Sequence, residues 1–277
     1  MTASTPTEPA RPTPRRILLL LLVGLIGGAF SGAFGVGGGI IMVPLMLWLL
    51  GFDQRRAAAT SLAAIVLSSI SGATTYFAAG HVDVVAGLLV GAGGIVGSLI
   101  GTRLLRILPI VWLRWGFILL LVVIAVRMFL SVPNREGEFD LSVVGTIAAL
   151  VVTGLFMGIA AGLFGVGGGV LIVPIFIALF GVSDLVAKGT SLLAMIPTSV
   201  SGTIANTRAK LLRPLDAVVI GSAAVVSAFG GALLAQVMDP MVSAILFGVF
   251  VSVTAVQLAY RAIRAQRAAK PKPDSSS

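Results

Sequence analysis

Two glycine clusters are the residues of this sequence whose type and spacing most clearly indicate chemistry. Each interrupts a long apolar run; they are Gly35, Gly37, Gly38 and Gly39 in the first run and Gly165, Gly167, Gly168 and Gly169 in the second. Glycine is about 1 kcal/mol less favourable than alanine inside a helix. One explanation is an unwound segment at membrane depth, after which a half-helix points unpaired N–H groups and its positive dipole end into a cavity that binds an anion. The alternative is a tight turn with close backbone packing between helices, and both can hold together.

A Thr-Ser pair follows each glycine cluster at the same distance. The pairs are Thr60 with Ser61 and Thr190 with Ser191, each at the point where a short apolar segment gives way to a long one. More hydroxyl and amide side chains follow on both long segments: Ser68, Ser69, Ser71, Thr74, Thr198, Ser199, Ser201, Thr203 and Asn206. These groups could donate to an oxyanion or form bonds between helices, which are typically worth well under about 2 kcal/mol per pair. The predicted substrate-binding residues are the eight glycines and the two Thr-Ser pairs.

The two clusters belong to an internal repeat. Residues 32–44 and 162–174 lie 130 positions apart and are identical at nine of thirteen positions. We therefore predict transmembrane repeats at 17–132 and 141–263, joined by an external linker at 133–140. They are flanked by a disordered cytoplasmic tail at 1–16 and a basic cytoplasmic tail at 264–277.

The composition places this repeat in a membrane. Hydrophobic residues make up 57% of the chain and charged residues 10%, and the mean hydropathy is +1.09. Long apolar runs without period-two alternation favour helices over a barrel, so the expected fold is an all-α polytopic membrane protein. The segments 40–51 and 170–182 are too short for an ordinary span, which leaves a steep crossing or a re-entrant hairpin. The absence of cysteine excludes disulfides and thiol chemistry.

The basic residues predict the orientation. With the N-terminus in the cytoplasm, 16 of the 19 Lys and Arg residues lie inside, and only Arg127, Arg135 and Lys188 lie outside, as the positive-inside rule requires. Both termini are then cytoplasmic and the protein is a multi-pass protein of the inner (plasma) membrane. Each unit crosses the membrane an odd number of times, so the second unit starts on the opposite face from the first. We therefore expect two inverted-topology repeats with broken or re-entrant helices and a binding site near the midplane of the membrane.

Few charged groups are expected deep in the membrane. No carboxylate or histidine falls in the middle of a predicted span, whereas proton-driven carriers usually have one there. Lys188 and Arg103 lie near span ends, where snorkelling to the surface is expected. Because His, Asp and Glu form no cluster at ligand spacing, we expect no metal, no cofactor and no enzyme activity.

Glycines at four-residue spacing are expected to form packing faces between helices. They are Gly24, Gly28 and Gly32, Gly93, Gly97 and Gly101, and Gly154, Gly158 and Gly162.

The duplicated pattern resembles the TauE/SafE family of sulfite-exporter-like membrane permeases. The resemblance rests on Gly-Xaa-Phe-Gly-Xaa-Gly-Gly-Gly shortly before Val-Pro, at 32–44 and 162–174, each followed by its Thr-Ser pair. It implies an anion permease linked to sulfite, sulfoacetate and related organosulfur compounds. In the second copy, Asn206 and Thr207 replace Tyr76 and Phe77 of the first, so a site between the copies would be asymmetric.

The leading hypothesis is therefore a permease that exports small oxyanions or organosulfonates by alternating access of the two repeats. A passive anion channel and a non-transporting membrane scaffold are the alternatives. The expected partners are a small anion and the lipid bilayer. Nucleic acid is not expected, because the charges lie in short loops and tails, and homo-oligomerisation stays open.

Overall fold

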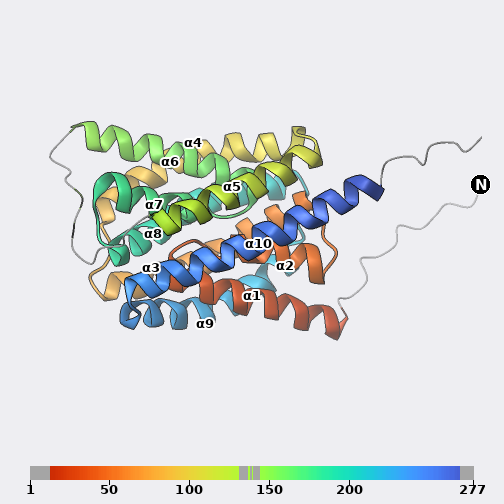
Figure 1. The fold of residues 1–277 in the computed structure, drawn as a ribbon, viewed down its shortest axis with the longest axis horizontal. Helices are drawn as coiled ribbons and strands as arrows, with labels where there is room; N and C mark the ends of the chain where they lie inside the picture. Colours follow the sequence, from red (N-terminus) through yellow and green to blue (C-terminus); the bar gives the residue numbers. More distant parts are fainter. Residues whose placement is uncertain (1–12, 131–136, 138, 140–143, 269–277) are drawn as a thin grey trace, which may run out of the picture.

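The computed structural model describes residues 13–130, 137, 139 and 144–268, and within these residues the chain is a bundle of helices (Figure 1). The first copy of the repeat forms α1 (Pro14–Phe34), α2 (Gly39–Leu49), α3 (Gln54–Ala78), α4 (Val84–Ile107) and α5 (Ile110–Leu130). The second forms α6 (Val144–Phe164), α7 (Gly169–Phe180), α8 (Asp184–Arg208), α9 (Pro214–Val237) and α10 (Pro240–Ala268). Most of the predicted linker and tails lies outside the described residues.

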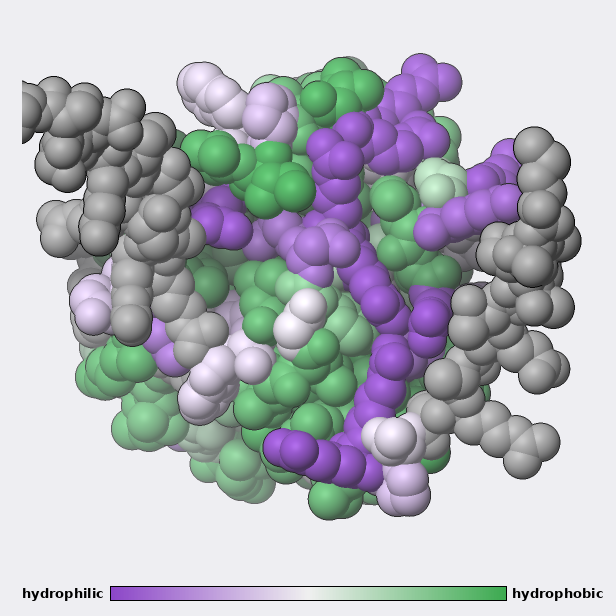
Figure 2. Space-filling view, turned by 90° about the vertical axis from the view of Figure 1, so that its right-hand side faces the viewer, coloured by the Kyte–Doolittle hydropathy of each residue, from purple (hydrophilic) through white to green (hydrophobic). Residues whose placement is uncertain are grey.

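The helices are built for a membrane. In the described part of the chain, α1, α3, α4, α6 and α9 are each long and apolar enough to cross a bilayer. Large apolar side chains such as Leu18, Val96 and Val226 are exposed along them, as expected of surfaces that face lipid. Figure 2 views one end of the bundle and shows hydrophilic residues gathered across that end with hydrophobic residues around it. The predicted all-α polytopic membrane fold is confirmed.

The starts of the long helices are capped by the residues that precede them. Asp53 and Asp83 each accept a hydrogen bond from the backbone N–H three residues later, at 2.9 and 2.8 Å, and Ser183 does the same at 3.3 Å. Each satisfies one of the N–H groups that a first helical turn leaves unpaired. The boundaries between segments therefore have a local cause in the sequence.

The short helices α2 and α7 are the returning arms of hairpins. Arg16 at the start of α1 and Arg56 at the start of α3 both bind Asp216, so α2 brings the chain back to the end where α1 began. In the second copy, the backbone N–H of Ser183, just after α7, donates to the carbonyl of Gly137, which precedes α6. In the first copy α2 therefore runs back along the bundle, which favours the hairpin over a steep crossing for the short segment.

The prolines of the short helices do not end them. Pro44 and Pro174 lie inside α2 and α7, which continue to Leu49 and Phe180. Each proline is the sixth residue of its helix, so it lacks only the N–H that would bond the carbonyl four residues earlier. Both short helices therefore continue past an internal proline.

The two copies are interleaved. Helix α1 packs on α9 and α4 packs on α6, while α3 and α8 contact each other and also α9 and α4 respectively; Figure 1 shows α1 beside α9 and α4 beside α6. Helix α5 packs on α10. Each close helix pair thus joins one copy to the other, and the repeats form a single core.

The predicted glycine packing faces are confirmed at these contacts. A Cβ atom added at Gly24, Gly28 or Gly32 would collide with the backbone of α9. In the same way, the predicted glycines of α4 (Gly93, Gly97 and Gly101) and of α6 (Gly154, Gly158 and Gly162) each lie against the backbone of the other helix. Close approach of two backbones is the usual role of small residues in membrane helices. The interleaving of the copies therefore depends on the absence of side chains here.

A leucine in this packing face should destabilise the fold. In Gly97→Leu the added side chain meets the backbone of Leu155 and Ile159, so we expect a loss of about 3 kcal/mol or more. Gly230 faces open space, so Gly230→Leu is the matched control and should retain wild-type stability. Thermal unfolding of the purified proteins in detergent measures both, and equal stability of the two variants would contradict the packing role.

Candidate functional site

The two glycine turns meet inside the bundle. Gly35, Gly37 and Gly38, between α1 and α2, have φ of 68°, 78° and 70°. Their counterparts Gly165, Gly167 and Gly168, between α6 and α7, have φ of 71°, 81° and 83°. These values lie in the left-handed region, where other residues are strained. The predicted clusters are therefore two turns of matching conformation.

The turns lie directly against each other. A Cβ atom added at Gly39 would collide with the carbonyl oxygen of Gly165, and one added at Gly169 with that of Gly35. All eight predicted glycines are buried. The structure thus brings residues 130 positions apart into one site.

The serine of each Thr-Ser pair holds the turn of the other copy. Ser61 Oγ donates to the carbonyl oxygen of Gly165 at 2.8 Å, and Ser191 Oγ donates to that of Gly35 at 2.6 Å. Both serines are fully buried. Because their hydroxyl protons are used on backbone carbonyls, they position the turns in this conformation and do not donate to a ligand.

The N-termini of the two short helices have unused donors. The N-caps of α2 and α7 are Gly38 and Gly168, which bring no side-chain cap. Among the described residues, no hydrogen bond satisfies the backbone N–H groups of the two residues that follow each cap: Gly39, Ile40, Gly169 and Val170. Buried N–H groups without partners are rare and costly. Four such groups at two helix N-termini form a concentration of partial positive charge that suits an anion.

The threonines of the Thr-Ser pairs differ from each other. Both are fully buried. Thr190 Oγ1 accepts from the backbone N–H of Asp83 at 2.9 Å, whereas Thr60 Oγ1 is without a hydrogen-bond partner in the described part of the chain. Thr60 therefore has a hydroxyl available for a ligand, and its counterpart is tied to the start of α4.

Two apolar side chains cover the glycine turns. Ile65 of α3 and Met195 of α8, at equivalent positions of the two copies, both approach Gly37 and Gly167. Both are fully buried. Nothing in the sequence distinguishes them, since each is one apolar residue among many. A ligand at the turns requires them to move, and methionine, unbranched and flexible, adapts more easily than isoleucine.

Two further hydroxyls lie one helical turn beyond these apolar residues. Ser69 and Ser199 are at equivalent positions, are fully buried and have no hydrogen-bond partner among the described residues. Helical spacing places each on the same face as Ile65 or Met195. Both belong to the hydroxyl-rich segments of the sequence. Other serines there donate a hydrogen bond to a carbonyl of their own helix, whereas the hydroxyls of these two have no such acceptor among the described residues.

Charged groups close the bundle at one end. The Asp216 carboxylate is buried and binds Arg16 and Arg56, each at 2.8 Å. The guanidinium of Arg56 also lies over the Phe52 ring, 4.1 Å from its centroid. The starts of α1, α3 and α9 are thereby tied together by charge-assisted hydrogen bonds. This carboxylate was not recognised in the sequence because its partners are 160 and 200 residues away.

A second charged cluster lies at the start of α8. Lys188 Nζ binds Asp184 and the hydroxyl of Ser243 on α10, both at 3.1 Å. The Lys188 side chain is only 6% exposed, so the expectation that it snorkels to the surface is wrong: its partners inside the protein replace water. Arg103 is exposed, in agreement with its expected place.

Helices broken inside the bundle, with unsatisfied N-termini at the break, define the class of polytopic membrane transporters with discontinuous helices. The family model described as "Sulfite exporter TauE/SafE" matches residues 1–128 and 150–276. The chain therefore belongs to the TauE/SafE family, and it is a membrane transporter.

Curated relatives carry matching names. The chain is 29% identical over 191 residues to "Probable membrane transporter protein YdhB" of Bacillus subtilis, covering 68% of this chain and 77% of the relative. It is 31% identical over 198 residues to a "Probable membrane transporter protein" of Haemophilus influenzae, covering 67% and 72%. A third relative, "Probable membrane transporter protein MJ0441" of Methanocaldococcus jannaschii, is 26% identical over 198 residues, covering 67% and 70%. No solved structure matches the chain.

Removing either turn-holding hydroxyl should destabilise the protein. Ser61→Ala and Ser191→Ala each leave a buried glycine carbonyl without this donor, which costs about 1–3 kcal/mol. Ser222 is exposed and bonds only its own helix, so Ser222→Ala is the control. Thermal unfolding in detergent is the measurement. If the two buried variants unfold together with the control, the serines do not hold the turns.

Proposed function

We propose that this transporter is an anion permease that exports sulfite, sulfoacetate or related organosulfur anions by alternating access of two inverted repeats. One observation carries the proposal: the unpartnered, buried N–H groups of Gly39, Ile40, Gly169 and Val170 at two adjoining helix N-termini. An oxyanion presents several acceptors to such donors. The predicted glycines form this site, Ser61 and Ser191 hold it, and each serine is preceded in the chain by a buried threonine, of which Thr60 has an unpartnered hydroxyl in the described part of the chain.

The chemistry of the site suits a ligand that must be released. The donors are backbone amides and hydroxyls, and the buried ammonium of Lys188 is engaged by Asp184 and Ser243. Dipolar groups bind an anion less strongly than a buried full charge does. Binding that is favourable enough for entry but weak enough for exit is what transport requires.

The filled centre of the bundle favours a carrier over an open channel. Ile65 and Met195 occupy the space against both glycine turns, so an anion reaches the N-termini only when the surrounding helices rearrange. The ion pairs of Asp216 at one end and of Lys188 at the other are suited to act as closures that open in turn. On this proposal the site is reached from one side of the membrane at a time.

The proposed setting is the plasma membrane with both termini in the cytoplasm. Helix α3 is 25 residues long, about 37 Å, and it begins at the Asp216 cluster. The carbonyl of His81, just after α3, lies against Gly189 of α8, next to the Lys188 cluster. The two clusters are thus about one membrane thickness apart, which supports opposite orientations of the two copies.

Thr60→Val should impair transport without unfolding the protein. Valine has the shape of threonine and Thr60 Oγ1 has no partner to lose, so we expect wild-type stability. A hydrogen bond to a charged ligand is worth about 1.5–3 kcal/mol, so sulfite affinity should fall about 10- to 100-fold. Sulfite flux in vesicles, with counterflow driven by unlabelled sulfite on the trans side, measures affinity and tests for a carrier.

The control for this variant is Thr74→Val, since Thr74 is exposed and bonds only the carbonyl of Ile70. Wild-type flux in Thr60→Val would remove Thr60 from the site, and flux indifferent to trans sulfite would indicate a pore. Gly38→Leu is a poor test of the binding site. Gly38 has a φ of 70° and lies against the backbone of Gly27, so a leucine there would disturb folding.

Cysteine labelling tests the orientation of the copies. Gly80 and Lys210 are equivalent positions, and both are exposed with positive φ. Since the chain has no cysteine, Gly80→Cys and Lys210→Cys each introduce a single target. An impermeant maleimide should label Gly80→Cys only from outside intact cells and Lys210→Cys only from the cytoplasmic side of inverted vesicles. Labelling of both from the same side would rule out inverted repeats.

A further inference from the structure

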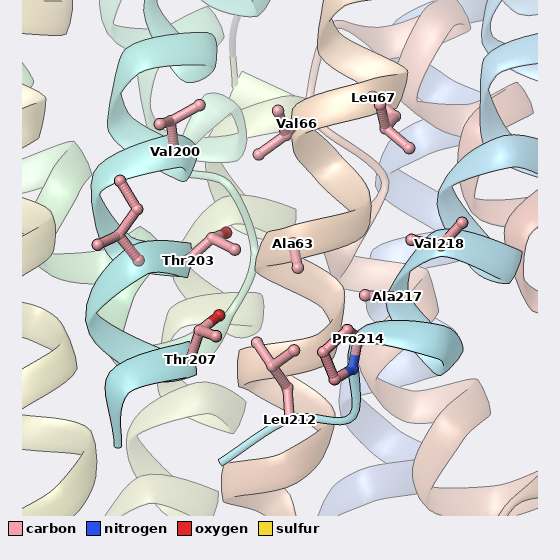
Figure 3. A pocket seen from close by; sticks show the side chains of 11 residues that line it. Ala63, Val66, Leu67, Val200, Thr203, Thr207, Leu212, Pro214, Ala217 and Val218 are labelled. Carbon is pink, nitrogen blue, oxygen red and sulfur yellow. The ribbon is translucent and has the colours of Figure 1, made fainter. Parts of the chain in front are cut away.

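A groove on the side of the bundle has no role in the proposed transport pathway. It has a volume of about 330 Å³ and lies between α3, α8 and α9 (Figure 3). Its walls are formed by Ala63, Val66 and Leu67 of α3, by residues of α8 around Thr203 and Thr207, and by Pro214, Ala217 and Val218 of α9. Val218 and Ile204 are 57% and 47% exposed, so the groove opens on the lipid-facing surface.

The groove is apolar along its length and polar only on one wall. Figure 3 shows the side chains of Thr203 and Thr207 beside the aliphatic groups, and Thr203 Oγ1 has no hydrogen-bond partner among the described residues. The lining runs from the loop between α8 and α9 toward the middle of the bundle. This is the direction that an acyl chain takes when its headgroup is at the membrane surface.

Three basic residues surround the end of the groove. Arg213 stands between Leu212 and Pro214, which both line it, and Arg208 directly follows Thr207; Lys210 lies in the same loop. All three are exposed. Within the described residues none has an ion-pair partner, because the nearby Asp216 is bound by Arg16 and Arg56. Helix α9 already carries Asp216 in its first turn, and because Arg16 and Arg56 neutralise that carboxylate, the three exposed basic residues remain available to attract an anionic group.

We propose that this groove is a binding site for an anionic phospholipid. One acyl chain lies along the apolar walls, and the phosphate lies between Arg208 and Arg213 at the start of α9. Basic residues next to a membrane surface attract anionic lipids, and the groove adds an apolar surface that holds the chain. The site is separate from the glycine turns, so it does not rest on the identity of the transported anion.

Lipid binding to the purified full-length chain tests this site. Dioleoylphosphatidylglycerol and dioleoylphosphatidylcholine are titrated into the detergent-solubilised protein, and bound lipid is measured by native mass spectrometry. We expect preferential binding of the phosphatidylglycerol. In Arg208→Gln/Arg213→Gln its affinity should fall about 25-fold, since each arginine contributes about fivefold.

Two matched variants make the outcome decisive. Arg103→Gln/Arg106→Gln removes two exposed arginines near the end of α4 that do not adjoin the groove, and it should leave phosphatidylglycerol affinity unchanged. Val66→Trp fills the groove with both arginines present and should abolish preferential binding. Equal affinity for the two lipids, equal losses in the two double variants, or full phosphatidylglycerol binding by Val66→Trp would each overturn the proposal.

Discussion

The structure depends on one constraint: a helix that breaks inside a membrane must satisfy its backbone without water. The chain breaks twice, and the carbonyls of Gly35 and Gly165 are satisfied by Ser191 and Ser61 of the opposite copies. Neither copy could satisfy its turn in this way alone. The backbone N–H groups that follow the turns, at the starts of α2 and α7, have no partner among the described residues. The turns therefore have satisfied carbonyls but leave N–H donors that a bound ligand could use.

The glycine faces make this exchange between copies geometrically feasible. Ser61 reaches the opposite turn only because α1 lies close to α9 and α4 close to α6, at distances that a side chain at Gly28 or Gly97 would prevent. Glycine therefore has two distinct roles in this chain. In the turns it permits positive φ, and along α1, α4 and α6 it permits close packing. Since the turns are also tightly packed, the explanation by close backbone packing holds for them, and anion binding at the turns stays a proposal.

Much of the fold could be predicted, because hydropathy is read from short segments and the 130-residue repeat is found by comparing the chain with itself. The apolar segment at 40–51, for example, corresponds to α2 at Gly39–Leu49. Re-entry could not be predicted, since segments of 11 or 12 residues fit either path. The structure brings the predicted glycines and Thr-Ser pairs together, but Ile65 and Met195 have no distinguishing pattern. Lys188 was misplaced although Asp184, four residues earlier, was a visible partner; its other partner, Ser243, is 55 residues away.

The two copies match at the glycine turns in the centre of the bundle and differ at the charged clusters at its two ends. Alanines at 86 and 58 occupy the positions equivalent to Asp216 and Lys188, so neither charged cluster has a counterpart at the equivalent positions of the repeat. The clusters also differ in burial. The two carboxylates are equally buried, each side chain being 3% exposed, but Arg16 and Arg56 are 27% and 28% exposed, so water can hydrate the arginines when they separate from Asp216. The ammonium of Lys188 is almost fully buried, and separating it from Asp184 leaves charges that are costly to expose to an apolar surrounding. If the two ends open in turn, as proposed, the Asp216 end opens at the lower cost, and the resting conformation is set more by the Lys188 cluster.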